Sequence, residues 1–149
     1  MILYLDSSAL VKLFAEEPGS DEVRSAVDEA VRSFTHLIAY PEVRSALARA
    51  LREGRETADA LNVHKQELDT MWRELGIVVP DEGLVRRAGD LAEEHELRGY
   101  DSVHLAAAEA LWQEAGSGVE FRFAVFDVDL AEAAESLGIK VLSARLPTD

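Results

Sequence analysis

Two acidic residues stand directly after short hydrophobic runs that are typical of β-strands. Asp6 follows the run 2–5, and Asp127 follows the run 121–126. In a parallel sheet the carboxyl ends of the strands meet at one edge, where the loops form a crevice that binds ligands. Asp is also a common turn and helix-capping residue, so either position alone could be purely structural. Two carboxylates close together at one edge would repel each other unless a cation lay near them.

Three further acids could approach the same edge of the sheet. Glu42 is expected in the first turn of the helix after the second strand, while Asp101 begins a later helix and could simply cap it. Asp129 could cap the next helix or act as an outer ligand. A carboxylate cluster with few nitrogen ligands suits a hard ion such as Mg²⁺ or Mn²⁺. Because such an ion orients and polarises a phosphate and activates water, the cluster favours phosphate-ester chemistry.

Strand-like and helix-like segments alternate along the whole chain. The expected strands cover residues 2–5, 34–39, 77–80, 121–126 and 139–142. The expected helices cover residues 9–17, 21–33, 41–53, 57–75, 82–95, 101–114 and 129–136, the first of them capped by Ser7 or Ser8. This alternation predicts a single α/β domain over residues 1–149 with a largely parallel sheet, followed only by a short tail.

Composition narrows the range of functions. The 149 residues include 15 basic and 29 acidic side chains, for a net charge of −14, and no cysteine. Disulfides, thiolate zinc sites and cysteine nucleophiles are therefore excluded. Neither a signal peptide nor a membrane-spanning run is expected, which predicts a cytoplasmic protein with no membrane partner.

The negative charge argues against a nonspecific nucleic-acid binder, except where a basic patch is present. Residues 41–55 form a stretch with four arginines and two glutamates, which is either a solvated helix face or a phosphate-binding surface. There is no glycine-rich phosphate loop. His104 lies one helical turn after Asp101, but its apolar neighbours favour a core or hydrogen-bonded histidine over a metal ligand. Trp72 and Met71 could belong to a partner groove, or to core or homodimer packing.

Four segments, taken in order, resemble a known family. LYLDSSALVKLF, YPEVRSAL, LRGYDSVHLAAA and FAVFDVDLAEAAESLGIKVL are similar to the PIN domains of the VapC-like toxin ribonucleases, with the family's order and spacing. Each segment alone is a weak signal, whereas the ordered set spans essentially the whole chain. The resemblance implies a PIN-like α/β domain with a central parallel sheet of four to five strands flanked by helices.

The resemblance also implies an activity, a cofactor and partners. It implies a metal-dependent endoribonuclease that is the toxin of a toxin–antitoxin pair, with an RNA substrate, a cognate antitoxin and a homodimeric state. By this resemblance the catalytic and metal-binding acids are Asp6, Glu42, Asp101 and Asp127, with Mg²⁺ or Mn²⁺ as cofactor. Ser8 and Asp129 match supporting positions, and Arg44 and Arg49 are the candidate RNA-binding residues.

One position departs from the family pattern. Two residues before the fourth acid the family often has Thr or Ser, whose hydroxyl can contact the site, whereas this chain has Val125. We expect this change to weaken the support of the site without removing a ligand. The alternative function is a catalytically weak PIN-like module that binds a partner protein, which the acidic charge and Val125 favour.

Overall fold

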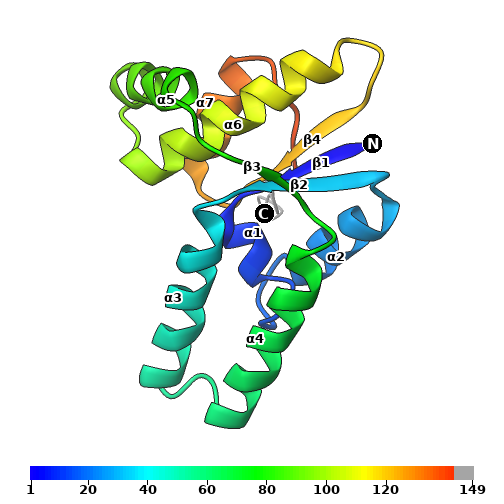
Figure 1. The fold of residues 1–149 in the computed structure, drawn as a ribbon, viewed down its shortest axis with the longest axis vertical. Coiled ribbons are helices and arrows are strands. Elements are labelled where there is room, and N and C mark those ends of the chain that lie inside the picture. Colours follow the sequence, from blue (N-terminus) through cyan, green and yellow to red (C-terminus); the bar gives the residue numbers. More distant parts are fainter. Residues whose placement is uncertain (143–149) are drawn as a thin grey trace, which may run out of the picture.

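A five-stranded parallel sheet lies at the centre of the fold in the computed structural model, which describes residues 1–142 (Figure 1). The expected tail lies outside the described residues. The order of the strands in the sheet is β3-β2-β1-β4-β5, and every neighbouring pair is parallel. This confirms the predicted fold class. The strands are β1 (Ile2–Leu5), β2 (Arg32–His36), β3 (Gly76–Val78), β4 (Phe121–Ala124) and β5 (Val141–Leu142).

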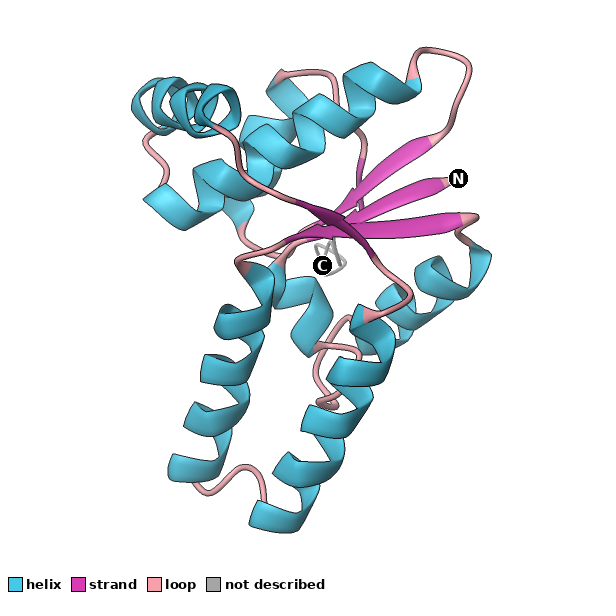
Figure 2. Ribbon diagram, viewed as in Figure 1, coloured by secondary structure: helices cyan, strands magenta, loops and turns pink. Residues whose placement is uncertain are grey.

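Helices cover both faces of the sheet (Figure 2). One layer contains α5 (Glu82–His95), α6 (Gly99–Ala115) and α7 (Val128–Ser136). The other contains α1 (Ser7–Val11), α2 (Ser20–Glu29), α3 (Ala39–Arg52) and α4 (Ala58–Trp72). The helices α3 and α4 extend away from the sheet as an antiparallel pair (Figure 1). Among residues 1–142, no helix has the length and hydrophobicity needed to cross a membrane.

The central strand β1 connects the two hydrophobic clusters of the core. Tyr4 belongs to the cluster under α5, α6 and α7, whereas Leu3 and Leu5 belong to the cluster under the other four helices. All three side chains are completely buried. A strand covered on both faces must be hydrophobic throughout, which explains the uninterrupted run at the start of the chain.

The chain changes direction across the sheet next to β1. From β1 it continues through β2 to β3 on one side, and it later returns to β4 and β5 on the other side. The crevice beyond the carboxyl ends of β1 and β4 is therefore a topological switch point, where open α/β sheets bind ligands. Asp6 directly follows β1, and its backbone N–H donates to the carbonyl of Ala124 at the end of β4.

Several predicted boundaries differ from the structure. Helix α2 ends at Glu29 and β2 begins at Arg32, because Ile2 of the central strand pairs with Arg32. Sheet pairing thus overrides the helical periodicity predicted through residue 33. The predicted second strand is also too long, because α3 already begins at Ala39. The prediction that Ser7 or Ser8 caps the first helix is wrong, since Asp6 is its N-cap.

Gly76 in β3 provides a test of the sheet packing. A Cβ atom at this position would overlap the ring of Phe34 on β2. We expect Gly76→Ala to lower the free energy of unfolding by about 1–3 kcal/mol, because ring and strand must both shift. Thermal denaturation followed by circular dichroism measures the effect.

Gly89 is the matched control for this substitution. It lies inside α5, where an added Cβ would meet nothing within 4 Å. Gly89→Ala should therefore stabilise the protein by up to about 1 kcal/mol through helix propensity. Equal effects of the two substitutions would contradict the packing described for Gly76.

Candidate functional site

Asp6 and Asp127 occupy equivalent positions at the starts of two helices. Asp6 is the N-cap of α1, and its Oδ1 accepts a hydrogen bond of 2.9 Å from the backbone N–H of Ala9. Asp127 is the N-cap of α7, and its Oδ1 accepts a 2.9 Å bond from the N–H of Leu130. Because β4 ends at Ala124, Asp127 follows its strand after two residues rather than directly. The two acids cap helices and also line one cavity.

The structure gathers all four predicted catalytic acids around a cavity of about 360 Å³ beyond the carboxyl ends of β1 and β4. Asp6 and Asp127 come from the strand ends, Glu42 from the first turn of α3 and Asp101 from the first turn of α6. Asp101 is not the cap of its helix, a position that Arg98 occupies. Asp129 is exposed and does not line this cavity. The remaining lining residues are Ser7, Ser8, Arg98, His104 and Phe126.

Asp6 is the most buried of the four acids, with only 4% of its surface exposed. Burial raises the pKa of its carboxyl group, and the charge of Asp101 raises it further. His104 and the hydrogen bonds from Ser8 (2.7 Å) and the Ala9 N–H oppose this rise without cancelling it. Ser8 thus lies where the sequence predicted, beside Asp6. The raised pKa means that the surroundings of Asp6 destabilise its ionised form.

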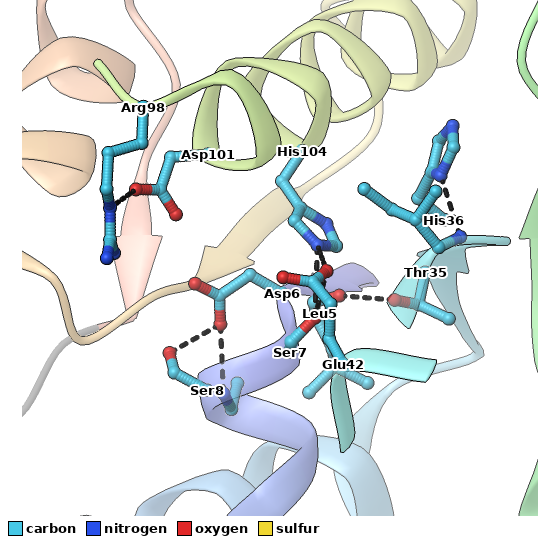
Figure 3. A network of polar contacts seen from close by, with 12 residues as sticks. Leu5, Asp6, Ser7, Ser8, Thr35, His36, Glu42, Arg98, Asp101 and His104 are labelled. Carbon is cyan, nitrogen blue, oxygen red and sulfur yellow. Dashed lines mark hydrogen bonds and ion pairs between the residues drawn. The ribbon is translucent and has the colours of Figure 1, made fainter. Parts of the chain in front are cut away.

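Glu42 is held by two side chains from other elements (Figure 3). Ser7 donates a hydrogen bond of 2.6 Å to its Oε1, and Nε2 of His104 lies 2.8 Å from the same oxygen. Burial alone would raise the pKa of Glu42, but these hydrogen bonds outweigh burial and the net pKa is lowered. Glu42 is therefore kept ionised. The prediction that His104 is a hydrogen-bonded core histidine is confirmed, since the side chain is 2% exposed and also contacts Tyr4.

Arg98 is the cation that lies nearest to Asp101. Its Nε donates a 2.9 Å hydrogen bond to Oδ2 of Asp101, although 82% of the arginine side chain is exposed. This pair lies apart from the Glu42 cluster in Figure 3. An ion pair this exposed contributes little free energy, so Asp101 can exchange Arg98 for another cation at low cost.

The chemistry of the donors fits a divalent ion, although the side chains would have to move. Within residues 1–142, no three carboxylate or imidazole side chains are grouped so that they could hold a metal ion as they lie. Asp101 instead faces Arg98, and Glu42 faces His104. Even so, the cavity offers oxygen ligands from four acids, and the destabilised Asp6 carboxylate would gain from a nearby cation. Oxygen-only donors of this kind suit Mg²⁺ or Mn²⁺.

A second hollow of about 590 Å³ adjoins the acidic cavity and shares Ser7, Ser8 and Glu42 with it. Arg49 and Tyr100 also line this hollow, and Tyr100 is 66% exposed. Arg44 lies on the same helix but lines neither hollow, because its Nη1 donates to the hydroxyl of Tyr40 at 3.0 Å. The structure thus brings one of the two predicted arginines to the rim of the site.

Val125 is completely buried in the hydrophobic cluster that contains Tyr4 and Leu105. Its side chain does not line the acidic cavity. In this chain Val125 therefore contributes to the hydrophobic core and not to the acidic cavity.

Arg98 and the contacts of Ser7 with the site were not predicted from the sequence. Arg98 precedes Asp101 by three residues, a helical spacing that commonly pairs opposite charges and could have revealed it. Ser7 gave no such signal, because its partner Glu42 is 35 residues away in the sequence.

The sequence of the chain is similar to a known protein family and to two named ribonucleases. A family model described as PIN domain matches residues 3–135. Two Mycobacterium tuberculosis proteins, Ribonuclease VapC45 of strain CDC 1551 / Oshkosh and Ribonuclease VapC49 of strain H37Rv, are each 36% identical over 145 residues. The alignments cover 97% of this chain and 97% of each relative.

Solved structures share the fold at lower sequence identity. The FitAB complex bound to a DNA fragment contains a chain with a TM-score of 0.67 and 17% identity, covering 96% of this chain and 94% of that one. VapBC2 from Rickettsia felis, bound to a promoter DNA fragment, gives a TM-score of 0.63 at 12% identity, covering 96% and 98%.

The buried charge of Asp6 leads to a stability prediction. A carboxyl group whose pKa is raised by folding destabilises the fold most at pH values above the raised pKa. This cost shrinks as the pH falls through the raised pKa and is gone below the group's ordinary pKa. Asp6→Asn keeps an oxygen for the Ala9 N–H and removes the charge. In EDTA at neutral pH we expect it to raise the melting temperature, by an amount that shrinks as the solution is acidified.

Asp81 is the matched control for Asp6. It caps α5 through a 2.8 Å bond from the Leu84 N–H, but it is exposed. Because Asn caps helices about as well as Asp, Asp81→Asn should change stability by less than about 0.5 kcal/mol. A lower melting temperature for Asp6→Asn in EDTA would contradict the argument from burial.

Proposed function

The chain belongs to the PIN domain family, and from that membership we propose that its acidic cavity hydrolyses RNA with the aid of Mg²⁺ or Mn²⁺. The protein is an endoribonuclease that acts as the toxin of a toxin–antitoxin pair. The extended similarity to proteins named ribonucleases supports this activity. We assign this activity to the acidic cavity on one observation. The cavity, at the switch point of the sheet, is lined by Asp6, Glu42, Asp101 and Asp127.

The four acids share one part in this proposal, and the residues beside them have others. Asp6, Asp101 and Asp127, with Glu42, would hold the divalent ion, which supplies positive charge to a phosphate oxygen and activates a water molecule. Ser8 and the start of α1 orient Asp6 through its Oδ1. Arg98, on leaving Asp101, is free to bind a phosphate of the RNA, because its guanidinium is exposed beside the cavity.

The adjoining hollow supports RNA as the substrate. Arg49 provides positive charge in the lining of this hollow, and the exposed ring of Tyr100 offers a face on which an unpaired base can stack. The hollow shares Glu42 with the acidic cavity, so a strand bound there would lead its phosphate to the acids.

A toxin requires an inhibitory partner, and we propose that a cognate antitoxin binds this chain. A solved structure described as a toxin–antitoxin complex from Klebsiella pneumoniae shares the fold, with a TM-score of 0.60 at 15% identity, and supports this partner. An apolar hollow suited to a partner side chain lies between the start of α3 and the end of α4, lined by Leu37, Ile38, Tyr40, Pro41 and Trp72. We also expect the chain to form a homodimer and to act in the cytoplasm.

The nuclease assignment is tested by cleavage of total RNA with the purified chain in Mg²⁺, Mn²⁺ or EDTA. We expect discrete products that require the metal. A change in a residue that only supports a metal ligand lowers activity by about 10- to 100-fold. Asp6→Asn should lower the cleavage rate by more than this, because it removes the negative charge of a direct ligand.

Asp81→Asn controls for the capping role of Asp6 without touching the cavity. It should cleave RNA like the wild type. Equal activity of wild type and Asp6→Asn would overturn the assignment of the site. A wild type that neither cleaves RNA nor binds the metal would instead favour the protein-interaction module.

Metal binding also leads to a prediction about stability. An ion that binds only the folded state stabilises it by about 2.7 kcal/mol when its concentration is 100 times the dissociation constant. For a domain of this size that corresponds to an increase in melting temperature of about 5–10 °C. We expect Mn²⁺ to produce such an increase in the wild type and to have a much smaller effect on Asp6→Asn. Differential scanning calorimetry across a metal titration measures it, and equal shifts for both proteins would contradict the proposed ligand.

A further inference from the structure

We propose that His104 is a positioning residue that, held in place by Tyr4, fixes the carboxylate of Glu42 for metal binding. This inference rests on the proposed function, because it assigns a purpose to Glu42 as a ligand. The three side chains come from β1, α3 and α6, so the contact joins the centre of the sheet to both helix layers at the site. Figure 3 shows His104 extending from α6 toward Glu42 and Ser7.

The hydrogen-bonding capacity of each group determines the direction of the contacts. An ionised carboxylate only accepts hydrogen bonds, so Nε2 of His104, at 2.8 Å from Oε1 of Glu42, must carry a proton. In the neutral imidazole Nδ1 is then the acceptor, and the hydroxyl of Tyr4 donates to it at 2.8 Å. Tyr4 therefore selects the tautomer that donates to Glu42.

Packing prevents the imidazole from turning away from this arrangement. The ring meets Tyr4 edge to face, with centroids 5.9 Å apart, and meets His36 in the same way at 6.2 Å. Burial lowers the pKa of His36 to about 4, so at physiological pH this ring packs against His104 as an uncharged neighbour. A ring fixed on both sides holds its donor atom at one position.

Glu42 is consequently held through one of its two oxygens. Ser7 and His104 both bind Oε1, which leaves Oε2 for a ligand in the cavity. A glutamate has three rotatable side-chain bonds and loses conformational entropy whenever it binds an ion. Because His104 and Ser7 have already restricted Glu42, less entropy remains to be lost when the metal binds.

Four variants test this role, with Mn²⁺ affinity measured by calorimetry without RNA, and with kcat and KM measured on RNA. His104→Leu removes the donor, and we expect it to weaken Mn²⁺ binding and to lower kcat by about 10- to 100-fold with KM unchanged. His104→Gln places an amide donor near Oε1 of Glu42, so it should restore most of the Mn²⁺ affinity and most of kcat. Tyr4→Phe removes only the hydroxyl and should produce a smaller loss of the same kind.

Thr35→Val is the matched control. Thr35 is also completely buried next to β1, but its hydroxyl donates to the carbonyl of Leu5 and does not contact Glu42. Its loss should lower the melting temperature while leaving Mn²⁺ affinity and kcat unchanged. If Thr35→Val weakened metal binding as strongly as Tyr4→Phe, the effect would be one of general stability and the proposal would fail.

The remaining outcomes separate this proposal from the nuclease assignment. If His104→Leu and Tyr4→Phe bound Mn²⁺ as tightly as the wild type while Asp6→Asn was inactive, the role of His104 would be overturned. The nuclease assignment would then still stand. If His104→Gln lost as much Mn²⁺ affinity and kcat as His104→Leu, the role of His104 would be overturned as well, because the amide donor would then have no effect. If His104→Leu does not fold, His104→Gln and Tyr4→Phe still test whether His104 positions Glu42. A wild type that binds no Mn²⁺ overturns both proposals.

Discussion

The cost of placing several carboxylates beside one another at the edge of a hydrophobic sheet governs the arrangement of this protein. Asp6 is almost completely buried, and its pKa is raised by that burial and by the charge of Asp101. Neighbouring groups offset part of the cost. The start of α1 and Ser8 bind Asp6, Arg98 pairs with Asp101, and Ser7 and His104 bind Glu42. A divalent cation would offset the remainder, which is why the electrostatics and the proposed chemistry agree.

The sheet topology makes this concentration of charge possible. Strands β1 and β4 are neighbours although they lie far apart in the sequence. The backbone N–H of Asp6 donates to the carbonyl of Ala124, 118 positions further along the chain, at 3.3 Å. Their carboxyl ends open into the same crevice, and helices α3 and α6 begin beside it. Every acid of the cavity thus stands at the start of a helix or in its first turn, where backbone N–H groups and the helix dipole favour negative charge.

Much of this arrangement could be predicted from the sequence, because the relevant signals are local. Hydrophobic runs locate the strands, and acids at their ends indicate the edge that carries the site. What escaped prediction depends on contacts between distant segments. The hydrogen bond between His104 and Glu42 spans 62 residues, and the start of β2 is set by its pairing with β1 rather than by its own pattern. Asp101 resembled a helix cap by spacing alone, although the helix begins earlier, and Asp129 fell outside the cavity because Asp127 caps α7.

Asp6 and Asp127 each cap a helix and also line the acidic cavity, and these two roles affect how such a protein can diverge. Each accepts its capping hydrogen bond through a single carboxylate oxygen, which an asparagine amide supplies equally well. A lineage can therefore lose the charge at either position through one substitution and still inherit an intact scaffold. Surfaces elsewhere on the molecule do not depend on that charge, so the loss of the chemistry in the cavity and the loss of the fold are separable events.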